Sequence, residues 1–239
     1  MLSVCLCIAG VYVGNQLTVT SLNMSREAGD QLRPVVCEQR VLTQPDGSAT
    51  FSQGQSSVIA AVYGPTAVRP ARERADRATV EVVFKPKVGV GGCSARGVEQ
   101  VIRGLCESVI LTSLHPRTAF TVVVQEMHSD GALLACCINA VCAALLDACA
   151  PMNFPFAAVA CIVDANGLVT VDPDKELELS SISSATFVFD AEDQNVLATS
   201  TAGCMSDETL QTCIAACQQA SKSVFALYRQ ICTKRAAVL

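Results

Sequence analysis

The sequence contains no tryptophan, and aromatic residues make up only 5% of it. A surface that binds nucleic acid by stacking bases on aromatic rings is therefore not expected. Charged residues are also scarce, at 16%, and the formal net charge is −5, so the chain as a whole lacks the basic character of a nucleic-acid-binding protein. Any contact with RNA would have to use a local patch or more basic partners.

Several motifs of catalysis and cofactor binding are missing as well. The chain has no P-loop, no G-x-G-x-x-G and no G-x-S-x-G. Its two histidines, His115 and His128, are therefore interpreted as surface or loop residues. With two histidines and no C-x-x-C pair, a structural zinc site has little support, and no metal or cofactor is expected.

Cysteine, by contrast, is abundant, with 14 residues. In a short secreted chain this number would suggest a disulfide framework. Here Cys136, Cys137 and Cys142 fall inside an apolar helical run, where cysteine behaves as a small hydrophobic residue. We interpret the chain as a reduced, intracellular protein. A secreted, disulfide-bonded binding protein is the alternative, and it depends on the cysteine count and on residues 1–23.

The first 32 residues are predicted to be an extension outside the fold. Residues 2–13 resemble the apolar core of a signal peptide, but no lysine or arginine precedes them. They are also too few to span a membrane. Met24 opens a polar segment typical of an ordinary start, so we expect an alternative start at Met24 and a folded domain over residues 33–239.

The rest of the chain predicts one compact α+β domain with no linker. Strands are expected over residues 35–43, 49–53, 57–63, 79–84, 118–124, 157–163, 167–171, 184–190 and 195–201, and helices over residues 98–114, 132–149 and 207–234. In the second helix only Asn139 and Asp147 interrupt small or apolar residues. A helix apolar on nearly every face must be covered on nearly every face, so it is expected at the centre of the fold.

Two charged segments have both a structural and a functional interpretation. Residues 66–78 mix four arginines with Glu73 and Asp76, and a solvated loop is favoured over a binding patch. Residues 172–178 carry four carboxylates: Asp172, Asp174, Glu176 and Glu178. Such carboxylates can hold a metal or act in acid–base catalysis, but a solvated acidic loop is favoured.

A third pattern suggests anion binding. We expect Arg117 and Asp130-Gly131 to lie at the two approaches to the central helix. The helix that opens after Gly131 offers free N–H groups to an anion, and Arg117 with Thr118 could add phosphate contacts. Equally, Arg117 could be a turn residue paired with Asp130 or Glu126.

Three segments resemble the RNase PH family. They are PDGSATFSQGQSSVIAAVYGP (residues 45–65), LHPRT (residues 114–118) and HSDGALLACCINAVCAALLDA (residues 128–148). The resemblance extends from about Arg33 to the C-terminus, and within the family it is greatest to ring subunits of the eukaryotic RNA exosome.

The resemblance implies a two-layer α+β RNase PH-like fold. It also implies a ring of six such subunits, capped by RNA-binding subunits, with single-stranded RNA threaded through the pore, in the nucleus, nucleolus and cytoplasm. Active members cleave RNA from its 3′ end with inorganic phosphate as the nucleophile. Their Arg-Thr pair and Asp-Gly loop, matched here by Arg117, Thr118, Asp130 and Gly131, bind that phosphate.

The chain departs from the family pattern where the chemistry takes place. Active enzymes continue the loop with Gly-Thr-Arg, whereas here the sequence is Ala132-Leu133-Leu134. The two catalytic aspartates of the family fall on Glu178 and Ser184, so the second carboxylate is lost. Losing one member of a catalytic group commonly removes most of the rate.

We therefore expect a non-catalytic structural subunit of the exosome ring. Arg96, Arg103 and Arg117 are the residues expected to contact the RNA backbone, independently of sequence. For Arg96 and Arg103, surface or interface salt bridges are an equal alternative. The alternative function is a phosphorolytic exoribonuclease, or a homodimeric nuclease outside the ring.

Overall fold

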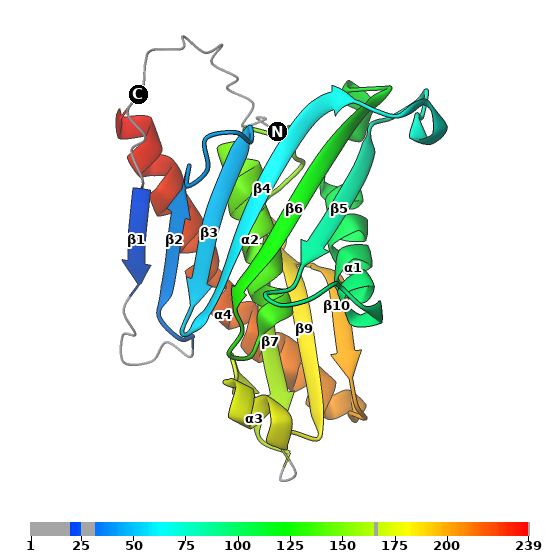
Figure 1. The fold of residues 1–239 in the computed structure, drawn as a ribbon. Coiled ribbons are helices and arrows are strands. Elements are labelled where there is room, and N and C mark those ends of the chain that lie inside the picture. The colour runs from blue at the N-terminus through cyan, green and yellow to red at the C-terminus, as the bar shows by residue number, and fades with distance from the viewer. Residues whose placement is uncertain (1–19, 25–31, 165–166, 239) are drawn as a thin grey trace.

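The computed structural model describes residues 20–24, 32–164 and 167–238 (Figure 1). The first of two sheets has the strand order β1-β2-β3-β4-β6-β5. Its strands are β1 (Thr20–Met24), β2 (Val35–Gln39), β3 (Gly47–Gln53), β4 (Ser56–Ala67), β5 (Thr79–Lys85) and β6 (Thr118–His128). All neighbours are antiparallel except β5 and β6, which are parallel. A parallel pair needs a crossover, and the helix α1 (Cys93–Val109) supplies it.

The second sheet has the strand order β10-β9-β7-β8 and is antiparallel throughout. Its strands are β7 (Phe156–Val163), β8 (Val169–Val171), β9 (Ser183–Asp190) and β10 (Val196–Ala202). The remaining helices are α2 (Leu133–Asp147), α3 (Lys175–Ser180) and α4 (Asp207–Val238), with short 3-10 turns η1 (Pro70–Arg72) and η2 (Thr112–Leu114). None of the described helices is long and apolar enough to cross a bilayer.

The helix α2 joins the two sheets. It packs on β3 and β4 of the first sheet and on β7 of the second, and most of its residues are buried. The prediction of a central helix covered on nearly every face is therefore confirmed. All eight residues of β7 are buried too, because α2 and α4 both pack against this strand.

The two polar residues of α2 both have partners. Asn139 lies beside the part of β7 that β8 does not reach, since β8 pairs only with residues 161–163. Its side chain accepts a hydrogen bond from the Ala158 N–H (2.8 Å) and donates one to the Ala158 carbonyl (2.9 Å). Asn139 thus takes the place of a neighbouring strand for one residue. The Tyr228 hydroxyl of α4 contacts the same side chain at 3.3 Å.

Asp147 holds the other end of α2. It accepts a hydrogen bond from the Ser48 N–H (3.0 Å) and forms ion pairs with Arg235 (3.0 Å) and Arg40 (3.5 Å). Arg235 also donates to the Leu146 and Asp147 carbonyls in the last turn of the helix. The last turns of α4 therefore fix the end of α2 against the β2–β3 connection.

Helix α1 begins and ends five residues earlier than predicted. The expected range was 98–114, whereas the helix ends at Val109 because Ile110 is extended and forms a bridge with Met152. The Leu111 N–H then bonds the Pro151 carbonyl, so the chain turns away from the helix axis. The acidic segment predicted to be a loop also contains a helix, the short α3.

The structure places residues 20–24 inside the fold, whereas residues 1–32 were predicted to lie outside it. They form β1, which pairs with β2 from Thr20↔Gln39 to Met24↔Val35, and Leu32 is buried in the core. Residues 1–19 and 25–31 lie outside the described residues. The alternative start at Met24 stays a prediction.

The cysteines in the core are neutral thiols. All twelve described cysteines are free, and eight of them are buried. Burial raises the pKa of Cys106, Cys136 and Cys142 from 9.0 to about 12. A thiol is nucleophilic only as the thiolate, so these three pack as small apolar residues at neutral pH.

Replacing Asn139 by alanine should destabilise the chain strongly. The variant leaves two backbone groups of Ala158 buried without partners, and each such group costs about 1–3 kcal/mol. We expect the free energy of unfolding in urea to fall by about 2–5 kcal/mol. Asn195→Ala, at an exposed position, is the matched control and should change it by less than about 0.5 kcal/mol. Equal losses in both variants would contradict the role of Asn139.

Candidate functional site

The Asp130-Gly131 dipeptide lies between the end of β6 and the start of α2. Gly131 has a φ of +86°, and a Cβ at this position would lie 2.5 Å from the Pro173 carbonyl oxygen. Only glycine combines this backbone conformation with so close an approach. The segment before α3 is therefore packed directly on the start of α2, although the two are far apart in the sequence.

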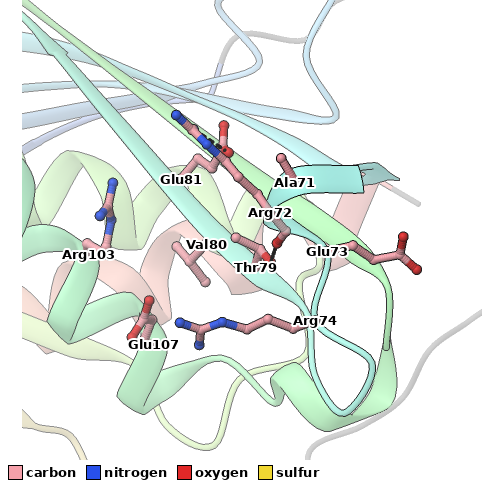
Figure 2. Close-up of a pocket in the computed structure, with 9 residues that line it drawn as sticks. All are labelled: Ala71, Arg72, Glu73, Arg74, Thr79, Val80, Glu81, Arg103 and Glu107. Carbon is pink, nitrogen blue, oxygen red and sulfur yellow. Dashed lines mark hydrogen bonds and ion pairs between the residues drawn. The ribbon is translucent and has the colours of Figure 1, made fainter. Parts of the chain in front are cut away.

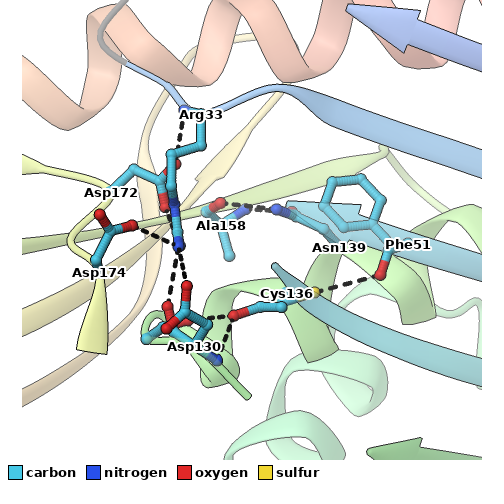
Figure 3. Close-up of polar contacts among 10 residues, drawn as sticks. Arg33, Phe51, Asp130, Cys136, Asn139, Ala158, Asp172 and Asp174 are labelled. Carbon is cyan, nitrogen blue, oxygen red and sulfur yellow. Dashed lines mark hydrogen bonds and ion pairs between the residues drawn. The ribbon is translucent and has the colours of Figure 1, made fainter. Parts of the chain in front are cut away.

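Arg33 joins these two segments (Figure 3). Its guanidinium donates to the Asp172 carboxylate (2.8 Å), to the Asp174 carboxylate (2.9 Å) and to the Asp130 carbonyl (2.9 Å). Its backbone N–H donates to the second oxygen of Asp172 at 2.8 Å. One cation thus connects the segment that leads into β2 with both segments of the site.

The electrostatics of Arg33 depend on these partners. Burial by itself lowers the pKa of the guanidinium, but the hydrogen bond to Asp172 and the charges of Asp172, Asp174 and Asp130 raise it above its usual value. The side chain is 10% exposed and that of Asp172 is 1% exposed. A buried carboxylate left without its cation is costly, so each partner depends on the other.

The four carboxylates of residues 172–178 do not share one environment. Glu176 and Glu178 are exposed on α3, as the solvated-loop interpretation expects. That interpretation is wrong for Asp172, which is buried, and for Asp174, which binds Arg33. Among the described residues, no group of side chains is arranged to hold a metal ion.

The two residues that fall on the family's catalytic aspartates lie on consecutive elements. Glu178 is on α3, and its backbone N–H bonds the Asp174 carbonyl. Ser184 is half-buried on β9, where it pairs with Ile162 and Ala202. Within the described residues, the Glu178 carboxylate takes part in no ion pair, and Ser184 offers a hydroxyl where a carboxylate was expected.

Arg117 and Thr118 lie at the opposite end of β6 from Asp130-Gly131. At about 3.3 Å per residue, the 11 residues of β6 put roughly 36 Å between the two motifs. Arg117 is exposed, and its ion-pair partner is Glu73 at 3.6 Å, so the suggested pairing with Asp130 or Glu126 is wrong. The Thr118 hydroxyl donates to the His115 carbonyl at 2.7 Å. Within one chain, the two motifs cannot bind the same phosphate.

The remaining predicted residues are exposed on α1, and one of them lines a groove. Arg103 faces a groove of about 460 Å³ between η1, β5 and α1, whereas Arg96 does not line it (Figure 2). Sequence reasoning missed both this groove and Arg33. The partners of Arg33 lie 97 to 141 positions away in the sequence, and local sequence patterns do not predict contacts over such distances.

The histidines have no catalytic surroundings in this structure. His128 is exposed at the end of β6. His115 is half-buried and packs edge-on against Phe120, with 6.0 Å between the ring centres. The interpretation of both as surface or loop residues agrees with these positions.

Comparison with known proteins places these features in a family. Residues 31–151 match the model of the 3′ exoribonuclease family, domain 1 (RNase PH). The chain is 40% identical over 171 residues to an "Exosome complex exonuclease RRP46 homolog" of Arabidopsis thaliana, which covers 70% of this chain and 72% of the relative. It is 33% identical over 223 residues to the protein of the same name from Oryza sativa subsp. japonica, covering 87% of this chain and 94% of the relative.

A solved structure agrees with this match. The crystal structure of rice Rrp46 has a TM-score of 0.79 at 35% identity and covers 85% of this chain and 96% of that chain. The fold described above is thus an RNase PH-like α+β fold, as expected. The matched range of the family model includes Asp130-Gly131 and α2 but ends before Glu178 and Ser184.

Removing the Arg33 cation should unfold the site and weaken the whole domain. We expect Arg33→Ala to lower the free energy of unfolding by about 3–5 kcal/mol, because the buried Asp172 carboxylate loses its counter-ion. The measurement is equilibrium unfolding in urea. Arg96→Ala removes the same side chain from an exposed position on α1 and should cost less than about 0.5 kcal/mol. An unchanged stability in Arg33→Ala would contradict the structural role assigned to this ion pair.

Proposed function

Because the chain belongs to the RNase PH family of 3′ exoribonucleases, we propose that it is a non-catalytic structural subunit of the RNA exosome core ring. In that role it supports 3′-to-5′ RNA processing and degradation, including rRNA maturation and mRNA decay. The similarity to the rice protein over 94% of that protein's length supports this assignment. Within the ring, the subunit we propose is exosome component five.

The observation that carries the non-catalytic part is the charge of the Asp130 end of β6. Asp130, Asp172 and Asp174 come together there around Arg33, whose guanidinium is already bound to their carboxylates. Inorganic phosphate would meet a net negative surface. Ser184 can neither carry a negative charge at neutral pH nor donate a proton as a carboxylic acid does.

The start of α2 adds to this argument. Active members of the family continue the Asp-Gly loop with Gly-Thr-Arg. Here Leu133 and Leu134 occupy the Thr and Arg positions and are half-buried against the core. An anion at this helix start would therefore have no side-chain cation from α2. The helix N-terminus alone gives a small stabilisation, so phosphate is poorly compensated at this helix start, and the acid of the second aspartate is missing as well.

The partners we propose are other RNase PH-like subunits in a six-membered ring, RNA-binding cap subunits and single-stranded RNA. Basic residues are concentrated in one part of the chain. Residues 69–117 carry nine basic and five acidic side chains, a balance of +4, whereas the rest of the chain has a balance of −9. Arg96, Arg103 and Arg117 belong to this segment and are exposed. The location that fits this work is the nucleus, the nucleolus and the cytoplasm.

A second candidate function is a phosphorolytic exoribonuclease, or a homodimeric nuclease outside the ring. The observations in its favour are the retained Asp130-Gly131 loop, against which the start of α3 packs, and the exposed Glu178 carboxylate on α3. Product analysis distinguishes the two functions, because a phosphorolytic enzyme releases nucleoside diphosphates and a structural subunit does not.

The purified full-length chain should not shorten 5′-labelled single-stranded RNA, with or without inorganic phosphate. Nucleoside diphosphates in the reaction are the measured quantity, and an active RNase PH protein is the positive control. Glu178→Ala identifies contaminating nuclease, since a contaminant would act equally in both preparations. Phosphate-dependent release that disappears in Glu178→Ala would establish the enzyme and reject the non-catalytic assignment.

The ring assignment predicts stable assembly in cells. The full-length tagged chain should co-purify with five other RNase PH-like chains in equal amounts, as measured by quantitative mass spectrometry of the size-fractionated complex. Arg33→Ala, which weakens the fold, should reduce the yield of this complex, and the exposed control Asn195→Ala should not. Recovery of the chain alone, or only as a homodimer, would contradict the ring assignment.

A further inference from the structure

The groove between η1, β5 and α1 is far from the Asp130 end of the molecule. Thr79 and Glu81 pair with Ala119 and Thr121, at the start of β6, so the groove lies at the Arg117 end. Nine residues line it: Ala71, Arg72, Glu73, Arg74, Thr79, Val80, Glu81, Arg103 and Glu107. Figure 2 shows that they come from the segment after β4, from β5 and from α1. The groove is thus a separate feature from the degenerate site.

The lining itself carries three arginines and three glutamates, and Arg117, which pairs with Glu73 from outside the lining, adds one positive charge. Arg72 pairs with Glu81 at 2.8 Å, and Glu73 pairs with Arg117 at 3.6 Å. In the described part of the chain, neither Arg74 nor Arg103 forms an ion pair. Glu107 is the remaining carboxylate, so two guanidinium groups face one opposing charge. An arginine fork matches the geometry of a phosphate group and binds it through two parallel hydrogen bonds.

The backbone that carries these arginines is held in place. The Thr79 hydroxyl donates to the Arg72 carbonyl (3.0 Å), and the Arg117 N–H donates to the Arg74 carbonyl (3.1 Å). Arg103 and Glu107 are four residues apart on α1, so they project from the same face of a helix whose other face is buried in the core. A ligand would therefore find the walls of the groove already formed, which lowers the entropic cost of binding.

The lining also restricts what the ligand can be. It contains no aromatic ring, so a nucleobase has nothing to stack on. Its contacts would go to phosphates, which carry no sequence information. An extended polyanion with regularly spaced phosphates fits this arrangement better than a base-specific ligand does.

We propose that this groove binds the phosphodiester backbone of single-stranded RNA through Arg74 and Arg103. The inference rests on the proposed function, since it takes RNA as the polyanion, and it gives that function a defined contact surface. Arg72 remains paired with Glu81 and shapes the wall. The Glu107 carboxylate repels the phosphates and so limits the affinity for RNA.

The test uses the full-length chain and a fluorescent single-stranded RNA of mixed sequence, with binding measured by anisotropy over a range of KCl concentrations. In Arg74→Glu/Arg103→Glu we expect at least a tenfold loss of affinity. The salt dependence should also fall, by about 1.4 in the slope of log K against log salt, because two phosphate contacts are lost at about 0.7 each. Glu107→Gln removes the opposing charge and should tighten binding.

The matched control is Lys222→Glu/Arg229→Glu, which makes the same change in net charge on exposed positions of α4. It should leave the affinity and the slope unchanged. An equal loss in this control would show that only net charge matters, and an unchanged affinity in the groove variant would show that RNA binds elsewhere. Either result overturns the proposal, as would displacement of RNA by an acidic peptide at lower concentration than by unlabelled RNA.

These outcomes are separable from failure of the proposed function. Co-purification with the ring does not require the groove, so the Arg74→Glu/Arg103→Glu variant should still assemble. A chain that assembles but gives the same affinity in the variant and the unmodified protein refutes the groove alone. A chain that never joins a ring refutes the proposed function, whatever the groove binds.

Discussion

The fold depends on the burial of α2 between its two sheets. A helix so apolar has no stable place on a surface, and the molecule provides cover from β3 and β4 on one side and β7 on the other. Apolar contact alone would allow the helix to slide or rotate. Asn139 and Asp147 prevent this, because each has hydrogen-bond partners in only one register. The polar interruptions of the sequence are thus the contacts that fix the position of the helix.

Everything at the Asp130 end is built on the start of that helix. Gly131 allows the segment before α3 to touch the turn before α2, and Arg33 connects both to the segment that leads into β2. The ion pairs that stabilise this region also neutralise the Arg33 guanidinium, which is then not available to an anion. A structure of this kind keeps the shape of a phosphate-handling fold while its electrostatics oppose phosphate. At the other end of β6, the ion pairs of the groove instead leave Arg74 and Arg103 facing the single carboxylate of Glu107.

The sequence predicted the elements whose signal is local. The alternating strands, the central helix and the last helix are recognised from periodicity, and the structure contains all of them. The end of α1 was missed because it is set by the bridge between Ile110 and Met152, which lie 42 positions apart. Arg33 was missed for the same reason. Arg117 and Asp130 were treated as one site because both were expected at the approaches to the central helix, whereas the extended strand β6 separates them.

The strand β1 has a consequence for how the sheet meets its surroundings. It pairs with all of β2 and so supplies the outer edge of the first sheet. A chain translated from Met24 would retain one of its five residues and leave the backbone donors and acceptors of β2 open. Open strand edges recruit other strands, and proteins usually protect them against aggregation. The choice of start codon would then decide whether the edge strand β2 is covered by β1 of the same chain or by a strand of another molecule.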